Sequence, residues 1–368
     1  MLTGYATAEG TADYAHRFAQ LPGNYRPMLG LAVSSIGMGT YLGEGDAATD
    51  AAYAETLRAA LFGGVNLIDT AVNYRYQRSE RVIGVVLEEL ITEEKIRREE
   101  IIVATKGGYL TFDGEMPPNP RAWFEDHFVK PGIVSTADIV QGSHCITPRY
   151  LNSMLETSRQ NLGLETIDAY YLHNPEAQLA AVNRMDFRDR IVRAFRFFEQ
   201  AVSDGRIRLY GAATWNGFRV AKTERAYLSL LELVEIAREV GGEDHHFRMV
   251  QLPYNLAMAE ALTTRNQPMP GGGTGSLLAC AEKLGIAVCA SASLLQGQLT
   301  HQLPDILNET FTGMGSDAQR ALQFVRSTPG INVALAGMAS AIHVAHNLET
   351  AQHPPASFET LMKLFQSA

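Results

Sequence analysis

Four ionisable side chains suited to acid–base chemistry stand at or just beyond the ends of short apolar runs: Asp69, Tyr74, Lys106 and His173. The runs occupy residues 65–68, 101–105 and 167–172, and they have the length and composition of buried strands. Ionisable groups that follow buried strands are typical of sites, because hydrophobic cores exclude them. Any one of the four is simply explained as a solvated side chain, but four of them after three successive runs indicate one site.

Together these four groups are suited to protonate a carbonyl oxygen. A tyrosine hydroxyl has a pKa of about 10, and a neighbouring ammonium such as that of Lys106 favours the phenolate and lowers this pKa. Asp69 would keep the lysine charged and oriented, while a neutral His173 would hydrogen-bond the oxygen of a bound carbonyl. Tyr74 is then a general acid for carbonyl reduction, or a base for the reverse reaction. Since the sequence shows neither a metal-ligand cluster nor an evident nucleophile–base pair, hydride transfer from a nicotinamide cofactor is the natural partner reaction.

Units of one strand followed by one helix account for most of the 368 residues. Strands are expected near residues 33–38, 65–69, 101–105, 167–172, 207–213, 248–252, 286–291 and 332–336. Helices are expected near residues 50–63, 79–92, 148–162, 186–204, 223–240, 275–284, 316–327 and 340–350. Such alternation is typical of a parallel sheet covered on both faces, and the number of units predicts a single-domain α/β fold, a closed (β/α)8 TIM barrel. The alternative is a doubly wound open sheet, which the absence of a Gly-x-Gly-x-x-Gly turn after the first strand disfavours.

Two segments lie outside the regular barrel pattern. Residues 1–30 form an N-terminal arm suited to plug the barrel floor, and residues 31–368 form the barrel itself. Residues 107–147 form a long insertion after the third strand, and it leaves the same barrel face as Lys106. This insertion either lies over the active-site face or forms a solvent flap packed on the outer helices. The substrate pocket is then expected to be lined by four aromatic side chains: Tyr41, Tyr109, Trp123 and Trp215.

These motifs, in this order, resemble the aldo-keto reductases over residues 29–348. The resemblance rests on residues 29–41, 68–71, Tyr74 with 79–80, 104–106, 172–173, 205–211, 250–255, Gly297, and Gly337 with 347–348. It implies a barrel that transfers hydride between a nicotinamide cofactor and a carbonyl or alcohol substrate. It also implies that Tyr74 is the general acid–base, that Asp69 and Lys106 tune it, and that His173 orients the carbonyl.

The resemblance further implies a cofactor site made of ten residues: Thr40, Tyr41, Asp69, Thr214, Gln251, Ser291, Leu294, Gly297, Gly337 and Asn347. Two positions depart from the family pattern. The family's Ser-Asn pair after the fifth strand falls on Ala213-Thr214, and its stacking tyrosine after the seventh strand is Ser291. Loss of an aromatic stack weakens cofactor binding by about 0.5–1.5 kcal/mol without abolishing it.

The choice between NADP(H) and NAD(H) is open. The family generally places a lysine or arginine just after the eighth-strand glycine, where it meets the 2′-phosphate. Here Gly337 is followed by Met338, Ala339 and Ser340, without a cation. A phosphate requires a charge-assisted partner, so the family favours NADP(H) while the local residues favour NAD(H).

Composition argues against several other classes of function. With 31 basic and 40 acidic residues the net charge is −9, which disfavours nucleic-acid binding. No apolar run approaches the roughly 20 residues of a membrane helix, and the N-terminus lacks the pattern of a signal peptide. Three scattered cysteines indicate a reducing compartment, so the protein is expected in the cytoplasm. The glycine-rich tract 270–276 lacks the lysine of a P-loop and is expected to be a loop in which Ser276 caps the next helix.

The sequence therefore predicts a cytoplasmic NAD(P)H-dependent oxidoreductase that acts on a small-molecule carbonyl or alcohol without a metal. One alternative is a nicotinamide-binding barrel that serves as a sensing or scaffold subunit with little turnover, an idea suggested by the altered nicotinamide pocket. Another is a barrel enzyme of unrelated chemistry. Substrate identity and oligomeric state do not follow from these patterns.

Overall fold

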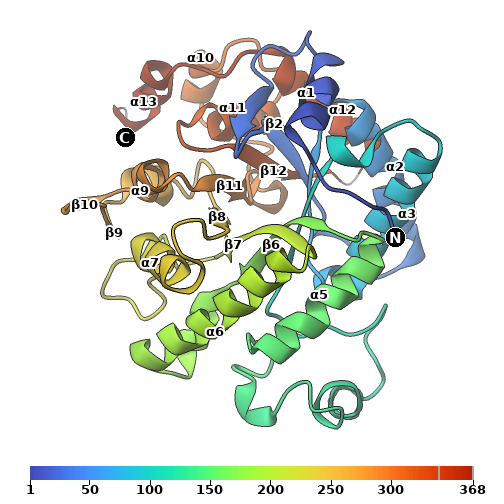
Figure 1. Cartoon of the computed structure of the whole chain (residues 1–368). Helices are drawn as coiled ribbons and strands as arrows, with labels where there is room; N and C mark the ends of the chain where they lie inside the picture. The colour runs from blue at the N-terminus through green and yellow to red at the C-terminus, as the bar shows by residue number, and fades with distance from the viewer. Residues whose placement is uncertain (339, 367–368) are drawn as a thin grey trace.

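Eight parallel strands close into a barrel in the computed structural model, which describes residues 1–338 and 340–366 (Figure 1). Around the barrel they follow one another in chain order: β3 (Ile36–Gly39), β4 (Leu67–Asp69), β5 (Ile102–Gly107), β6 (Ile167–His173), β7 (Ile207–Ala213), β8 (Phe247–Pro253), β11 (Ala287–Ser291) and β12 (Val333–Gly337). Strand β12 pairs with β3 and closes the ring. The predicted (β/α)8 barrel is confirmed, and the open-sheet alternative is wrong.

The barrel strands are apolar along their length because both of their faces are buried. Every residue of β6 is buried. Ala169 and Tyr171 belong to the apolar cluster inside the barrel, while Tyr170 packs outward against Phe198. Alternate side chains of one strand therefore fill two apolar layers, which produces the continuous apolar runs seen in the sequence.

Helices that follow the barrel strands form an outer layer around the barrel (Figure 1): α2 (Ala47–Phe62), α3 (Arg78–Thr92), α5 (Pro148–Leu162), α6 (Arg184–Ser203), α7 (Leu230–Gly241), α9 (Leu277–Leu284), α11 (Asp317–Ser327) and α12 (Ala341–Glu349). Ser276 caps α9 by accepting a hydrogen bond from the backbone N–H of Ala279, as predicted. The helix expected over 223–240 begins later, at Leu230, because Ser229 caps it and turns precede it.

Shorter elements complete the described chain: η1 (Tyr74–Gln77), η2 (Arg98–Glu100), η5 (Pro175–Ala180), α8 (Glu260–Thr263), η6 (Leu295–Gly297), α10 (Ile306–Thr310), η7 (Thr350–Gln352) and α13 (Phe358–Gln366). The glycine-rich tract joins two paired short strands, β9 (Gln267–Pro268) and β10 (Thr274–Gly275). Within residues 1–338 and 340–366, no helix is long and apolar enough to cross a membrane.

The first predicted strand, over residues 33–38, is two strands rather than one. β2 (Leu31–Ser34) pairs antiparallel with β1 (Tyr25–Met28), and the barrel strand β3 begins only at Ile36. The break falls at Ser35, and the hydroxyl of the neighbouring Ser34 donates a hydrogen bond to the carbonyl of Ile36 at 2.8 Å. A side chain that bonds the backbone two residues on favours a turn over a continuous strand.

The N-terminal arm covers the end of the barrel where the strands begin. Its predicted end at residue 30 falls in the turn of the β1–β2 hairpin, so the hairpin extends the arm to Ser34. Ala6, Met28 and Val33 join the apolar cluster inside the barrel. The arm therefore closes the barrel at the end opposite to the predicted site.

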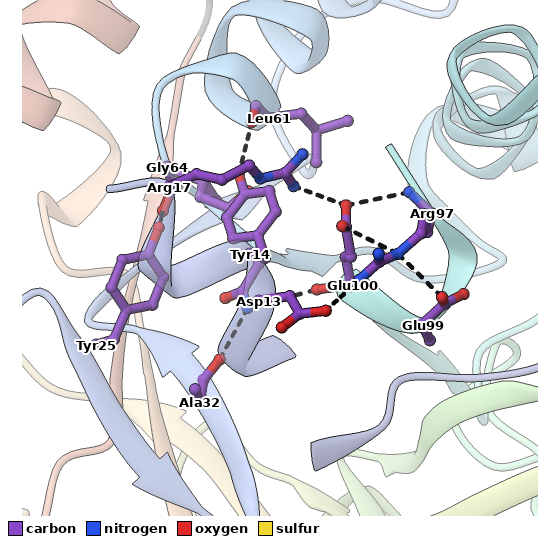
Figure 2. A network of polar contacts seen from close by, with 12 residues as sticks. Asp13, Tyr14, Arg17, Tyr25, Ala32, Leu61, Gly64, Arg97, Glu99 and Glu100 are labelled. Atoms are coloured by element: carbon purple, nitrogen blue, oxygen red, sulfur yellow. Dashed lines mark hydrogen bonds and ion pairs between the residues drawn. The ribbon is translucent and has the colours of Figure 1, made fainter. Parts of the chain in front are cut away.

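Polar contacts fix helix α1 (Ala8–His16) to the same end of the barrel (Figure 2). The hydroxyl of Tyr14 donates to the carbonyl of Val65 at 2.8 Å and also to that of Leu61. Arg17 pairs with the buried carboxylate of Glu100 at 2.7 Å. These bonds satisfy backbone and side-chain groups that the barrel leaves open there.

The insertion predicted over 107–147 is a folded segment. It contains α4 (Pro120–Phe124), η3 (Glu125–Val129) and η4 (Thr136–Asp138), and its two ends meet where the N–H of Cys145 donates to the carbonyl of Gly108 at 2.8 Å. Three of its apolar residues, Phe128, Val134 and Cys145, form a small cluster with Val72 and with Tyr150 and Met154 of α5. The insertion therefore packs on α5 and leaves the barrel at the end where Lys106 lies.

Candidate active site

The four predicted catalytic side chains meet at the end of the barrel where the strands finish. Asp69 and His173 are the last residues of β4 and β6, Lys106 is the penultimate residue of β5, and Tyr74 begins η1. Neighbouring parallel strands end side by side, so residues far apart in the sequence become neighbours there.

A buried ion pair forms the base of the site. Lys106 Nζ donates to Asp69 Oδ1 at 2.6 Å and to the carbonyl of Thr70 at 2.7 Å. The amide of Gln251 donates to the other carboxylate oxygen, Asp69 Oδ2, at 2.6 Å. Both carboxylate oxygens are therefore bonded, and the ammonium has two acceptors, as a buried pair requires.

Tyr74 lies over this pair. Lys106 Nζ is 4.9 Å from the centre of the Tyr74 ring. The ring of His173 approaches the same phenol edge-on with 6.0 Å between ring centres, and Tyr41 does so from the outer side at 5.0 Å. The phenol, the ammonium and the imidazole therefore lie close together, the arrangement that general acid catalysis of carbonyl reduction needs.

A strained turn places Tyr74 beside the ammonium and the imidazole. The three residues after it have left-handed backbones: Arg75, Tyr76 and Gln77. Each costs about 1–2 kcal/mol in a non-glycine residue, so the turn must be held by its surroundings. The buried guanidinium of Arg75 pairs with Asp50 at 2.5 Å, and Gln77 donates to the carbonyl of Phe112 in the insertion at 2.9 Å.

Burial sets the protonation states of the site. Burial lowers the pKa of Lys106, but Asp69 and Tyr74 outweigh this effect, so its pKa is raised and the ammonium stays charged. Burial raises the pKa of Asp69, and Lys106 opposes that rise. Burial and the positive charge of Lys106 hold the pKa of His173 well below its usual value, so the imidazole is neutral, as predicted.

The expected lowering of the Tyr74 pKa is wrong for this structure. Burial raises the pKa of the phenol, and the opposing effect of Lys106 is smaller. Tyr74 is therefore protonated at neutral pH, which suits an acid that must hold a proton until a carbonyl oxygen receives it.

Most of the predicted cofactor residues follow or end barrel strands at this same mouth. They comprise Thr40 and Tyr41 after β3, Asp69 in β4, Thr214 after β7, Gln251 in β8, Ser291 in β11 and Gly337 in β12, with Leu294 and Gly297 at η6 and Asn347 in α12. The hydroxyl of Thr214 is buried and has no hydrogen-bond partner among the described residues. An open hydroxyl in this position fits a carboxamide such as that of nicotinamide, because a buried polar atom requires a partner.

The predicted pocket aromatics divide into two groups. Tyr109 packs edge-on against His173 with 4.9 Å between ring centres, and its hydroxyl accepts from Asn174 at 3.1 Å. Tyr41 and Trp215 follow β3 and β7 at the barrel mouth and are 57% and 41% exposed, so both have surface to offer a ligand. Trp123 instead stacks on His127, 4.0 Å away within the insertion.

Sequence reasoning missed three buried polar residues behind the site: His144, Glu176 and Gln178. One oxygen of Glu176 accepts the backbone N–H groups of Trp215, Asn216 and Gly217, at 2.8, 3.0 and 3.2 Å. It thereby fixes the loop that follows Thr214. A carboxylate three positions beyond the end of a site strand was a usable signal for Glu176, whereas His144 lies in a polar segment that offered none.

A (β/α)8 barrel with tyrosine, lysine, aspartate and histidine assembled at its mouth has the architecture of a barrel oxidoreductase. Comparison with known proteins agrees, because the model of the aldo/keto reductase family matches residues 35–364. The chain belongs to the aldo/keto reductase family, whose members are NAD(P)-dependent oxidoreductases.

Individual relatives are distant. The chain is 27% identical over 198 residues to 6-dehydroglucose reductase of Novosphingobium aromaticivorans, covering 52% of this chain and 51% of that protein. It is 26% identical over 179 residues to the NADH-specific methylglyoxal reductase of Escherichia coli, covering 49% and 45%. The matches thus span about half the length of these relatives. An aldo/keto reductase of Klebsiella pneumoniae, solved with NADP and acetate, shares the fold with a TM-score of 0.62 at 20% identity, over 94% of this chain and 95% of that one.

Proposed function

We propose that this protein reduces small-molecule carbonyl compounds with NADH or NADPH, and oxidises the matching alcohols in the reverse direction. The convergence of Tyr74 with Lys106 and His173 carries this proposal. A subunit that only binds nicotinamide has no use for a phenol placed beside a charged lysine. The geometry therefore favours the enzyme over the sensing or scaffold alternative.

The chain's own residues supply the proton chemistry. Tyr74 holds the proton that the carbonyl oxygen receives, and the ammonium of Lys106 stabilises the phenolate that is left. The neutral imidazole of His173 donates an N–H to the same oxygen and fixes its position. A bound nicotinamide cofactor supplies the hydride. In the reverse direction the phenolate of Tyr74 takes the hydroxyl proton of the alcohol.

The residues around the mouth support use of both cofactors. Thr214 and Gln251 would hold the carboxamide of the nicotinamide. At the position where a 2′-phosphate would lie, Gly337 is followed by the buried Met338, by Ala339, which lies outside the described residues, and by Ser340, whose hydroxyl caps α12. Because this segment contains no cation, it offers the 2′-phosphate of NADPH no charge-assisted partner. NADH should therefore bind about as well as NADPH.

The proposed substrate is small, because the acid lies inside the barrel mouth between Tyr41 and His173. We also propose a cytoplasmic location. The three cysteines are free and buried, which suits a reducing compartment: Cys145, Cys280 and Cys289.

A titration of the purified protein with NADH and NADPH, followed by tryptophan fluorescence, tests the cofactor proposal directly. The expected result is saturable quenching by at least one of them, followed by turnover in a screen of carbonyl compounds that Tyr74→Phe abolishes. Binding without turnover on any carbonyl would support the sensing alternative. Binding of neither cofactor would show that the departures at Ala213 and Ser291 have removed the nicotinamide site.

A further inference from the structure

His144 is a buried histidine that lies directly behind His173 and takes no part in the chemistry described above. It comes from the end of the insertion and is 1% exposed. Its Nε2 lies 2.7 Å from the carbonyl oxygen of His173. A carbonyl oxygen can only accept, so Nε2 must carry the proton. His144 is therefore a donor to the backbone of the histidine that orients the substrate.

The same reasoning assigns the donor and acceptor roles of the other groups in this hydrogen-bond network. With Nε2 protonated, Nδ1 of the neutral ring must accept, and the side-chain amide of the fully buried Gln178 donates to it at 2.6 Å. The amide oxygen of Gln178 in turn accepts from the guanidinium of Arg190. Burial lowers the pKa of His144 to about 4, so the ring stays neutral. Every donor meets an acceptor, and one tautomer of His144 is selected.

His173 depends on this backbone support because no hydrogen bond from the described residues holds its ring. The Nδ1 atom of His173 is buried and has no partner among the described residues. The position of its ring is then set by its own backbone and by the flanking rings of Tyr74 and Tyr109. His144 supports two of these three, since its ring also packs against Tyr109 with 4.9 Å between centres.

The close approach of the two histidines also explains why residue 108 is a glycine. A Cβ atom at Gly108 would lie 2.8 Å from the carbonyl oxygen of His173 and 3.1 Å from Nε2 of His144. A side chain there would force these two atoms apart. Gly108 thus leaves the space in which the hydrogen bond forms.

We propose that His144, held by Gln178 and Arg190, is a positioning residue that fixes the backbone and the imidazole of His173 for the substrate carbonyl. The proposal rests on the proposed function, in which His173 orients that carbonyl. It gives the insertion a part in the reaction without any contact with substrate.

Three variants test the proposal. His144→Leu removes the donor, whereas His144→Gln keeps an amide that can donate to His173 and accept from Gln178. Tyr14→Phe is the matched control, because it removes a buried donor to backbone carbonyls at the opposite end of the barrel. His144→Leu should lower kcat about 10- to 100-fold, as misplacement of a catalytic group does, with the Kd for NADH unchanged. His144→Gln should recover most of kcat, and Tyr14→Phe should retain it.

A folded His144→Leu that keeps kcat within about twofold of wild type would overturn the proposal. Equal losses in His144→Leu and His144→Gln would do the same, because the hydrogen bond would then be irrelevant. Should His144→Leu fail to fold, Gln178→Leu replaces it. That variant leaves His144 and His173 in place but releases the tautomer, and an unchanged kcat would refute the proposed role.

A readout that needs no turnover separates this proposal from the proposed function. NMR spectra of protein labelled with 15N-histidine should show His144 neutral with its proton on Nε2. They should also show one set of His173 ring signals in wild type and His144→Gln, which broadens or shifts in His144→Leu. Unchanged His173 signals would overturn the positioning role even if the wild type reduced no carbonyl compound.

Discussion

The buried pair of Lys106 and Asp69 allows a quantitative test of how this site is held together. Its two charged atoms lie 2.6 Å apart, and the side chains are 1% and 6% exposed. Lys106→Met keeps the length of the side chain but removes the ammonium, which leaves the Asp69 carboxylate buried with the hydrogen bond from Gln251. Removing one partner of a buried pair costs about 3–5 kcal/mol, because the remaining charge is uncompensated.

A second substitution distinguishes the lost pair from lost packing. In the double variant Lys106→Met with Asp69→Asn the orphaned charge is gone, so stability should exceed that of Lys106→Met by about 1–3 kcal/mol. Equilibrium urea unfolding of wild type, both single variants and the double variant gives the coupling free energy. A coupling within about 0.5 kcal/mol of zero would refute the buried ion pair as the base of the site.

The same variants make a prediction in alkali. The pKa of Lys106 is raised in the folded protein, so folded protein keeps this proton longer than unfolded protein does. The stability that the pair contributes is therefore fully present below about pH 10.4 and is lost as pH rises beyond it. Buried tyrosines remote from the site, such as Tyr14, make the same contribution to the loss of stability in both proteins. The difference between wild type and Lys106→Met therefore reports Lys106 together with Tyr74, whose pKa Lys106 lowers. If the free energies of unfolding of wild type and Lys106→Met fell equally steeply with rising pH in alkali, the buried ion pair would be contradicted.

Three further predictions address the residues around this pair. Tyr74→Phe should abolish turnover while the Kd for NADH stays unchanged, and near-wild-type turnover would show that Tyr74 is not the acid. Glu176→Ala should cost about 2–3 kcal/mol and weaken NADH binding, because three backbone N–H groups beside Thr214 lose their acceptor. Glu176→Gln keeps an acceptor oxygen and serves as the control in the same thermal and fluorescence measurements. The pKa of about 4 for His144 means that unfolded protein binds a proton there first as pH falls below 6.5, so about 3 kcal/mol of stability should be lost by pH 4. In urea unfolding, His144→Gln should lack this component, and an identical acid dependence in both proteins would contradict it.

The barrel and the four central residues were predictable because their local patterns survive folding. A parallel strand buried on both faces yields a continuous apolar run, and a charged residue near its end, such as Lys106 in β5, marks the mouth. The prediction of one continuous first strand was wrong because the hydrophobic pattern does not show where the chain turns. Apolar residues stand on both sides of Ser34 and Ser35, and only the hydrogen bond of the Ser34 hydroxyl to the backbone shows that the chain turns between them.

The features of the site that could not be predicted from the sequence depend on burial in the folded protein. The sign of the Tyr74 pKa shift was mispredicted because sequence shows which charge is near the phenol but not how much water is excluded. His144 and Gln178 lie outside the strands and helices predicted from the sequence, where a solvated side chain is the natural expectation. Their role emerges only when donors and acceptors are matched through buried space.

The contacts of the insertion support a structural role in the site that neither of the two sequence alternatives described. Three left-handed residues after Tyr74 cost about 3–6 kcal/mol together, so the turn that aims the phenol persists only if its neighbours hold it. The insertion does so at two points, since the carbonyl of Phe112 accepts from Gln77 at 2.9 Å and Gly114 donates its N–H to the carbonyl of Tyr76 at 2.8 Å. Its far end supplies His144 to the backbone of His173. One segment thus supports both Tyr74, the proposed acid, and His173, the residue proposed to orient the carbonyl.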